Sequence, residues 1–166
     1  MKHGESFERY VLGLMHRDGY ELMAKTDPPV RVVRWTRGHN QFTGCFLEEG
    51  FLDLTGSING WHVEVEVKDC KGVRFPFSKI RPHQLRRMAD LCEDGALAGL
   101  ALRLRGARAD DDHVVFIPAW TLLGLVKGEK KSVTWKDLEV LVADGLVLEH
   151  TYRERGSMKK FFKLMV

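Results

Sequence analysis

Residues 53–68 read DLTGSINGWHVEVEVK, and this stretch decides the fold. Asn59-Gly60 is a strong signal for a tight hairpin turn, because both residue types tolerate a positive φ. After the turn, valines alternate with polar or charged residues at the period of a strand that has one buried face. The stretch therefore predicts two antiparallel strands, over residues 51–55 and 61–68.

The turn also predicts which residues face each other across the hairpin. If Ile58 faces Trp61, the same register places Asp53 opposite Glu66. Directly opposed Cβ atoms lie about 4.5–5.5 Å apart, so the two carboxylates would repel each other. Protonation of one carboxylate, or a divalent cation between them, relieves such repulsion. Lys68 projects from the same strand face as Glu66.

This arrangement suits phosphodiester hydrolysis. A metal ion held by two carboxylates polarises the phosphate and generates hydroxide, and a neighbouring lysine orients the water or balances developing charge. The alternative is an ordinary half-exposed strand, in which Glu64, Glu66 and Lys68 meet solvent or form ion pairs. A bulge at Gly56 would shift the register and separate the two carboxylates.

The rest of the chain alternates helices and strands, with no repeat and no linker. Apolar residues at helical spacing predict helices, and β-branched or alternating runs predict strands. The predicted helices cover residues 5–18, 82–94 and 120–126 and a segment from Thr134, and the predicted strands cover residues 20–25, 30–35, 97–104 and 114–118. This order indicates an α/β layout, with a mixed sheet and helices packed on it.

The chain of 166 residues fits one domain, 1–166. Within it we expect residues 36–50 to form a protruding stalk or loop, and residues 146–166 to form a basic C-terminal hairpin. The apolar runs are too short to cross a bilayer. The N-terminus has no apolar segment of the kind that directs secretion, so we do not expect a secretory signal. Three cysteines without a CxxC pair argue against a disulfide framework or a zinc finger. A reducing cytoplasm is the expected location.

Cations concentrate in two stretches, which suits binding to a phosphate backbone. Residues 74–87 contain five cations and no acid, and residues 152–163 interleave cations with aromatic side chains. The alternative is a solvated face with core aromatics. The candidate DNA contacts are Arg37, Arg74, Lys79, Arg81, Arg86, Arg87, Arg153, Arg155, Lys159 and Lys160.

Two further polar residues have two interpretations each. Glu8 lies at the edge of the apolar stripe of the first helix, and Gln84 lies early in the helix over residues 82–94. Either side chain is solvated, or it points inward at the metal site. In the second case, Gln84 would bind the attacking water or a phosphate.

Several motifs follow one another along the chain, namely Asp53-Leu-Thr-Gly56, Glu66-Val67-Lys68-Asp69, Phe75-Pro76-Phe77, His83-Gln84 and the segment GEKKSVTWKDLE over residues 128–139. This ordered set resembles the RecU family of Holliday junction resolvases. Gly4 and Glu8 are similar to the opening of archaeal junction resolvases. The sequence departs from the family in having Leu52 where a proline precedes the metal aspartate, and in a shorter segment for the stalk.

The resemblance implies an α/β, restriction-endonuclease-like mixed β-sheet flanked by helices, with an αβββαβ core. It implies a homodimer that cuts a DNA four-way junction by symmetric paired nicks with magnesium or manganese, in the cytoplasm of a bacterial or archaeal cell or of a phage host. By position, Asp53 and Glu66 would be metal ligands, and Lys68 the catalytic lysine. Glu8 would be an accessory metal-site carboxylate, and Gln84 an active-site polar group.

Two other functions stay open at this point. One is a nuclease of the same fold that acts on flap, nicked or duplex DNA. The other is a non-catalytic DNA-binding protein on this fold. The intact set of Asp53, Glu66 and Lys68 favours an enzyme.

Overall fold

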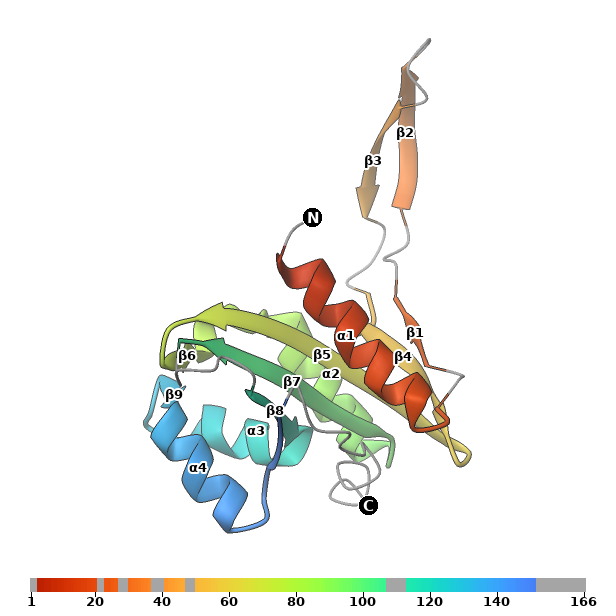
Figure 1. Ribbon diagram of the computed structural model, residues 1–166. Helices are drawn as coiled ribbons and strands as arrows, with labels where there is room; N and C mark the ends of the chain where they lie inside the picture. Colours follow the sequence, from red (N-terminus) through yellow and green to blue (C-terminus); the bar gives the residue numbers. More distant parts are fainter. Residues whose placement is uncertain are drawn as a thin grey trace.

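The computed structural model describes residues 3–20, 23–26, 30–36, 41–46, 50–106 and 113–151. Its main sheet has six strands in the order β1-β4-β5-β7-β8-β10 (Figure 1). These strands are β1 (Ala24–Lys25), β4 (Leu54–Ile58), β5 (Trp61–Lys71), β7 (Leu97–Arg105), β8 (His113–Pro118) and β10 (Leu148–Thr151). The pair β5–β7 is parallel and the other neighbours are antiparallel, so the sheet is mixed, as the sequence predicts.

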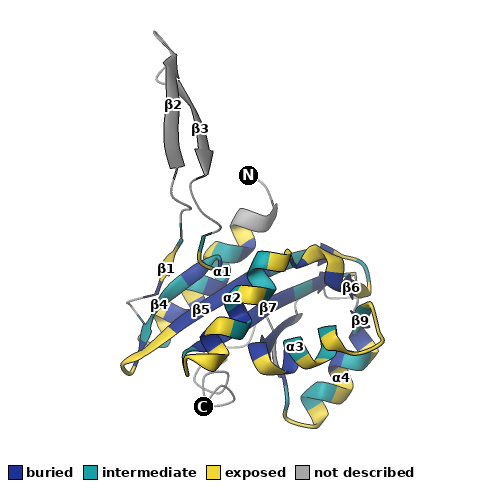
Figure 2. Cartoon of the chain, turned by 180° about the vertical axis from the view of Figure 1, so that it is seen from behind, coloured by how far each residue is buried: buried dark blue, intermediate teal, exposed yellow. Residues whose placement is uncertain are grey.

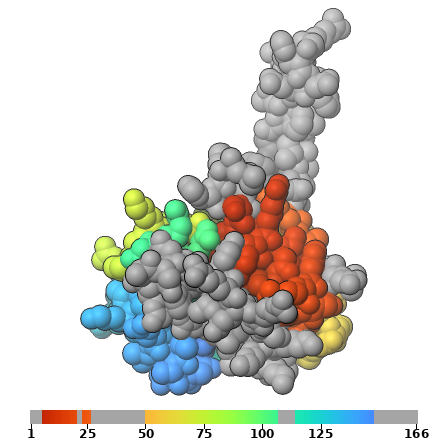
Figure 3. Space-filling model, in the orientation of Figure 1, coloured from red at the N-terminus to blue at the C-terminus, as the bar shows by residue number. Residues whose placement is uncertain are grey.

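Helices cover both faces of this sheet. Helix α1 (His3–Arg17) lies on one face, where the space-filling view shows it in red (Figure 3). Helices α2 (Pro82–Glu93) and α3 (Ala119–Lys127) cover the opposite face (Figure 2). Helix α2 lies in the crossover from β5 to β7, which parallel strands require.

The two faces carry separate apolar clusters. Under α1, the residues at helical spacing pack against the odd-numbered valines of β5. The members from these two elements are Phe7, Val11, Leu14, Met15, Val63, Val65 and Val67. The α1 face of β5 is therefore the apolar face that the alternation predicts.

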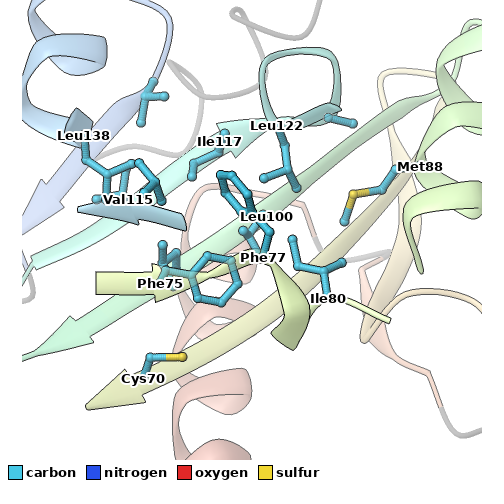
Figure 4. Close-up of a cluster of buried hydrophobic side chains, with 14 of the residues drawn as sticks. Cys70, Phe75, Phe77, Ile80, Met88, Leu100, Val115, Ile117, Leu122 and Leu138 are labelled. Atoms are coloured by element: carbon cyan, nitrogen blue, oxygen red, sulfur yellow. The ribbon is translucent and has the colours of Figure 1, made fainter. Parts of the chain in front are cut away.

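The second cluster lies under α2 and α3, and it includes Met88, Leu100 and Leu122 (Figure 4). Phe75 and Phe77 join it from a short segment that follows β5. That segment consists of β6 (Arg74–Pro76) and a 3₁₀ turn, η1 (Phe77–Lys79). Strand β6 pairs with β9 (Ser132–Thr134), which leads into α4 (Trp135–Ala143). Figure 1 shows β6 and β9 together at the C-terminal end of β5.

Strands β2 (Val30–Thr36) and β3 (Gln41–Phe46) form a two-stranded antiparallel sheet of their own, outside the main sheet. We call it the β2–β3 ribbon, and Figure 1 shows it extending away from the main sheet. The ribbon contains the strand predicted over residues 30–35 and part of the segment 36–50. Strand β10 pairs with β8, whereas residues 152–166 of the expected C-terminal hairpin lie outside the described residues.

The β4–β5 hairpin has the register that the turn predicts. Ile58 pairs with Trp61 and the register continues without a bulge to Leu54. The turn residues Asn59 and Gly60 both have positive φ, 51° and 84°, as a two-residue turn of this kind requires. The hairpin therefore brings Asp53, just before β4, to the level of Glu66.

Two predicted strand boundaries are wrong. Strand β4 begins at Leu54 rather than at residue 51, because the chain reaches the sheet only at Asp53, whose carbonyl accepts a bond of 2.9 Å from the Thr26 N–H. Within the described residues, the strand predicted over 20–25 covers only Ala24–Lys25. Tyr20 instead ends α1, through its N–H to the Met15 carbonyl at 3.1 Å.

The turn that sets this register should depend on Gly60. Its φ of 84° lies in the left-handed region and no atom lies within 4 Å of an added Cβ, so Gly60→Ala costs backbone strain alone. We expect Gly60→Ala to lower the free energy of unfolding by about 1 kcal/mol. Gly13→Ala is the matched control, because Gly13 lies inside α1 with equally open space, and it should stabilise by about 0.5–1 kcal/mol. Urea denaturation measures both, and a neutral Gly60→Ala would contradict the assigned turn.

Helix α4 should make the fold sensitive to acid. Thr134 is its N-cap, and the Asp137 carboxylate accepts from the Thr134 N–H at 2.8 Å and from Lys130 Nζ at 2.6 Å. Hydrogen bonds from Lys130 and Thr134 lower the pKa of Asp137 to about 2. Because the pKa is lowered on folding, this stabilisation is complete above about pH 4 and disappears towards pH 2.

Asp137→Asn should therefore cost about 1 kcal/mol at pH 6 and progressively less below pH 4. Asp144→Asn, at the other end of α4, is the control and should change stability little at either pH. Chemical denaturation at pH 6 and pH 3 tests this. A deficit of Asp137→Asn that stayed constant with pH would contradict the assigned capping.

Candidate active site

Strand β5 carries two carboxylates on the face that α2 covers. Glu64 and Glu66 alternate with the valines that face α1, so both point to the α2 side. Both are 0% exposed. Their burial excludes contact with solvent, whereas the ion pairs that the alternative interpretation allowed are present, between Glu66 and Lys68 and between Glu64 and Arg87.

The two oxygens of Glu66 have different surroundings. Oε1 accepts a bond of 2.6 Å from Gln84 Nε2 and a second, short bond from Lys68 Nζ. Oε2 is buried and has no hydrogen-bond partner in the described part of the chain. A buried carboxylate oxygen without a partner is costly, and either protonation or a bound cation would relieve that cost.

Asp53 lies beside Glu66, as the hairpin register predicts. Its Oδ2 accepts a bond of 2.8 Å from the Val67 N–H, which joins the start of β4 to the middle of β5. Burial, followed by the negative charge of Asp53, raises the pKa of Glu66 to about 7, although the Lys68 ammonium acts in the opposite direction. The two carboxyl groups therefore repel each other.

The donor set fits a divalent cation that prefers oxygen ligands. Carboxylates suit magnesium and manganese, and magnesium commonly takes one or two carboxylates and completes its shell with water and substrate phosphate. Across the described residues there is no group of three or more His, Cys, Asp or Glu side chains placed to hold a metal. Asp53 and Glu66 are the two neighbouring carboxylates here that could hold such an ion.

The structure does not bring Glu8 into this pair. Glu8 Oε2 lies 2.8 Å from Lys25 Nζ, and Lys25 pairs with Leu54, the residue after Asp53. Glu8 therefore lies at the neighbouring edge of β4, where it neutralises a lysine. Its role as an accessory metal-site carboxylate stays a prediction.

Gln84 lies in the site because of the way α2 begins. Pro82 occupies the first turn, and the Gln84 Oε1 accepts a bond of 2.9 Å from the Arg81 N–H. This bond turns the other end of the amide, Nε2, towards Glu66. Both ends of the Gln84 amide are therefore held. This supports the interpretation in which Gln84 points inward to the site rather than into solvent.

A second link between β5 and α2 lies beside the first. Arg87 donates from Nε, at 3.1 and 3.2 Å, and from Nη2 to the buried carboxylate of Glu64. Glu64 also contacts His62 Nε2 at 2.8 Å and accepts from the Leu52 N–H at 3.1 Å. Burial alone would raise the pKa of Glu64, but these hydrogen bonds outweigh it and lower the pKa.

Sequence reasoning did not find this Glu64–Arg87 link. Glu64 and Glu66 are two residues apart on a strand, and Gln84 and Arg87 are three apart on a helix, so each pair shares one face. Along the strand, Glu64 and Glu66 are about 6.6 Å apart, and along the helix, Gln84 and Arg87 are about 4.5 Å apart. These distances are similar enough for two side-by-side contacts between the strand and the helix. This match of spacings was the signal in the sequence.

The candidate DNA contacts fall into three groups. Four of them are exposed: Arg74 on β6, Lys79 on η1, Arg86 on α2, and Arg81 just before α2. Arg87 is directed at Glu64, with its guanidinium carbon 5.0 Å from the centre of the exposed Phe51 ring. The others lie outside the described residues, namely Arg37, Arg153, Arg155, Lys159 and Lys160.

The Glu64–Arg87 link should be a major stabilising contact. Arg87→Gln leaves a fully buried carboxylate with fewer donors, so we expect the free energy of unfolding to fall by about 2–3 kcal/mol. Arg86→Gln removes the same charge from an exposed position of the same helix and should change it by about 0.5 kcal/mol or less. Urea denaturation of the two variants tests this, and equal effects would mean that the link adds little.

Comparisons with known proteins identify the family and the fold. The model of the family described as Recombination protein U, RecU, matches residues 8–149. Hjc, a Holliday junction resolvase from the archaeal hyperthermophile Archaeoglobus fulgidus, has a similar structure with a TM-score of 0.52 and 16% sequence identity. The match covers 82% of this chain and 93% of that chain. No curated protein sequence matches.

The likeness to Hjc confirms the restriction-endonuclease-like fold class that the motifs predict. The family match spans most of the chain and confirms the resemblance to RecU proteins. Resolvases of this family act on DNA junctions and generally depend on a divalent metal ion. The chain belongs to the RecU family, and it is therefore a nuclease that resolves Holliday junctions.

Proposed function

We propose that the protein hydrolyses phosphodiester bonds at four-way junctions with a magnesium or manganese ion held by Asp53 and Glu66. The observation that carries this proposal is the buried, unpartnered Oε2 of Glu66 beside a second carboxylate. When bound, the ion would supply Lewis-acid activation of the phosphate and of a water nucleophile. Without the ion, the repulsion between the two carboxylates is only partly offset by Lys68.

Lys68 and Gln84 have distinct parts in this proposal. Lys68 is partly exposed, with 22% of its side chain accessible, while its ammonium contacts buried Glu66. It therefore lies between the carboxylates and the surface, where it balances negative charge that develops on the phosphate. Gln84 is a positioning residue: it holds Oε1 of Glu66 so that Oε2 stays available.

Selective cutting of a four-way junction requires two active sites, because two arms of the junction are cut together. We infer a homodimer, because two copies related by a two-fold axis match two arms of a junction at once. Symmetric paired nicks are the expected product. Within the described ranges, no helix has the length and apolar character to span a membrane. We infer the cytoplasm as the location, because the substrate is cellular or phage DNA.

Asp53→Asn should separate cleavage from binding. The asparagine Oδ1 still accepts from the Val67 N–H, so the hairpin stays closed, but a negative ligand is lost. We expect junction cleavage to fall on the order of 10³-fold or more, with junction affinity within about threefold of wild type. Asp94→Asn, an exposed acid just after α2, is the matched control and should leave both unchanged.

The assay compares an immobile junction, a mobile junction and linear duplex on a gel, with magnesium and with EDTA. Calorimetric titration of magnesium or manganese into the DNA-free protein supplies a readout besides activity, and Asp53→Asn should weaken that binding. Cleavage that survives in EDTA or in Asp53→Asn would overturn the metal assignment. Equal cutting of linear duplex would indicate a nuclease of this fold without junction selectivity.

Mixed dimers test the paired nicks. Wild-type protein mixed with excess Asp53→Asn protein should give dimers with a single active site, which nick one strand and leave the junction unresolved. The ratio of singly nicked to resolved product should then rise with the excess of variant. Full resolution at every mixing ratio would contradict a dimer with one active site per copy.

A further inference from the structure

A cleft of about 570 Å³ lies at the C-terminal end of β5. We call it the β6–β9 cleft, since β6 and η1 form one wall, and the residues that lead into β9 form the other. Its polar lining consists of Arg74, Ser78, Lys130, Lys131 and Ser132. No acidic residue is among the described residues that line it. The cleft is therefore an electropositive hollow with hydroxyl groups beside its cations.

Two of its cations are available to a ligand. Arg74 and Lys131 are exposed, and neither forms an ion pair within the described part of the chain. Lys130 differs, because its Nζ contacts Asp137 at 2.6 Å. The Lys131 carbonyl accepts a bond of 3.0 Å from the Phe77 N–H, which holds the two walls together. The walls are thus fixed by backbone contacts while the cationic side chains project from them.

The cleft continues a line of cations that starts at the candidate active site. Lys68 contacts Glu66, and Lys79 Nζ lies 3.3 Å from Cys70 Sγ on the same face of β5. Cys70 is four residues beyond Glu66, a distance of about 13 Å along a strand. Arg74 follows on β6, immediately after β5 ends. Positive charge therefore extends from the carboxylates to the cleft.

We propose that the β6–β9 cleft binds the sugar-phosphate backbone of a duplex arm, four to six base pairs from the phosphate that is cut. At 3.4 Å per base pair, the 13 Å to Cys70 corresponds to about four base pairs. Lys79, which contacts Cys70, directly follows Ser78 of the cleft wall. Lysine, arginine and serine side chains contact phosphates without reading bases. The cleft thus holds the arm in register while the active site acts on the strand. This inference rests on the proposed function.

Removing the cleft cations should change binding and its salt dependence together. Arg74→Gln and Lys131→Gln should each reduce the slope of log affinity against log salt by about 0.9, which is about eightfold in affinity at 0.1 M salt. Arg17→Gln is the control, because Arg17 is an exposed cation at the end of α1, on the other face of the sheet. It should change affinity by less than about twofold. Fluorescence anisotropy of a labelled junction in EDTA measures all three.

Single-turnover cleavage with saturating protein separates this inference from the proposed function. At saturating protein, where weaker binding no longer limits the reaction, the two cleft variants should still cut the junction. Wild-type protein that binds no junction, or never cuts one, would refute the proposed function. If the wild-type protein cuts junctions but the cleft variants show the same salt dependence of binding as Arg17→Gln, the proposed role of the cleft is refuted and the proposed function is not.

Uncharged phosphate analogues in the DNA can locate the phosphate that the cleft contacts. A methylphosphonate placed four to six base pairs from the cut should weaken binding of the wild-type protein, but not of the double variant Arg74→Gln/Lys131→Gln. Equal weakening of both proteins would overturn the proposal. Thermal melting of each variant confirms that it is folded before binding is compared.

Discussion

The burial of two carboxylates on one face of β5 is the constraint on which the rest of the site depends. A carboxylate out of water must be paired or neutralised. Glu64 is paired completely, with Arg87, His62 and the Leu52 N–H around it. Glu66 is paired at one oxygen only. The same strand thus places a saturated carboxylate two residues from an unsaturated one.

Helix α2 meets both needs at once. Its first turn supplies Gln84 and its next turn supplies Arg87, while Met88 and Leu91 pack into the apolar cluster beneath. The helix is therefore held against β5 by apolar contact along one stripe and by polar links along another. A helix held in this way has little freedom to slide or rotate. The helix therefore holds Gln84 and Arg87 in fixed positions against β5.

Much of this arrangement could be predicted from the sequence, because local signals govern it. Asn59-Gly60 determines the hairpin register, and that register alone places Asp53 beside Glu66. The likeness to Hjc adds the fold class, and the family match adds the activity. The roles of Asp53, Glu66 and Lys68 as ligands and catalytic lysine stay predictions.

Other features depend on contacts distant in the chain. Alternating residues of β5 are consistent with a solvated face, and only the packing of α2 shows that Glu64 and Glu66 are buried. Strands β6 and β9 have three residues each, too few to show a period, and they form by pairing across more than fifty residues. The direction of Arg87 was missed for the same reason, since a cation in a basic stretch gives no sign that it faces inward.

The β2–β3 ribbon leaves and rejoins the sheet at a single point. β1 and β4 flank the ribbon in the chain, and they pair with each other, with Lys25 opposite Leu54. The Thr26 N–H then closes the base onto the Asp53 carbonyl. An insert with its ends held together costs the sheet little more than loop closure, about 0.6 kcal/mol per doubling of length. Evolution can therefore lengthen, shorten or exchange the ribbon as a module while Asp53 stays beside Glu66. The length of the ribbon and the arrangement of the active-site residues can then change independently of each other.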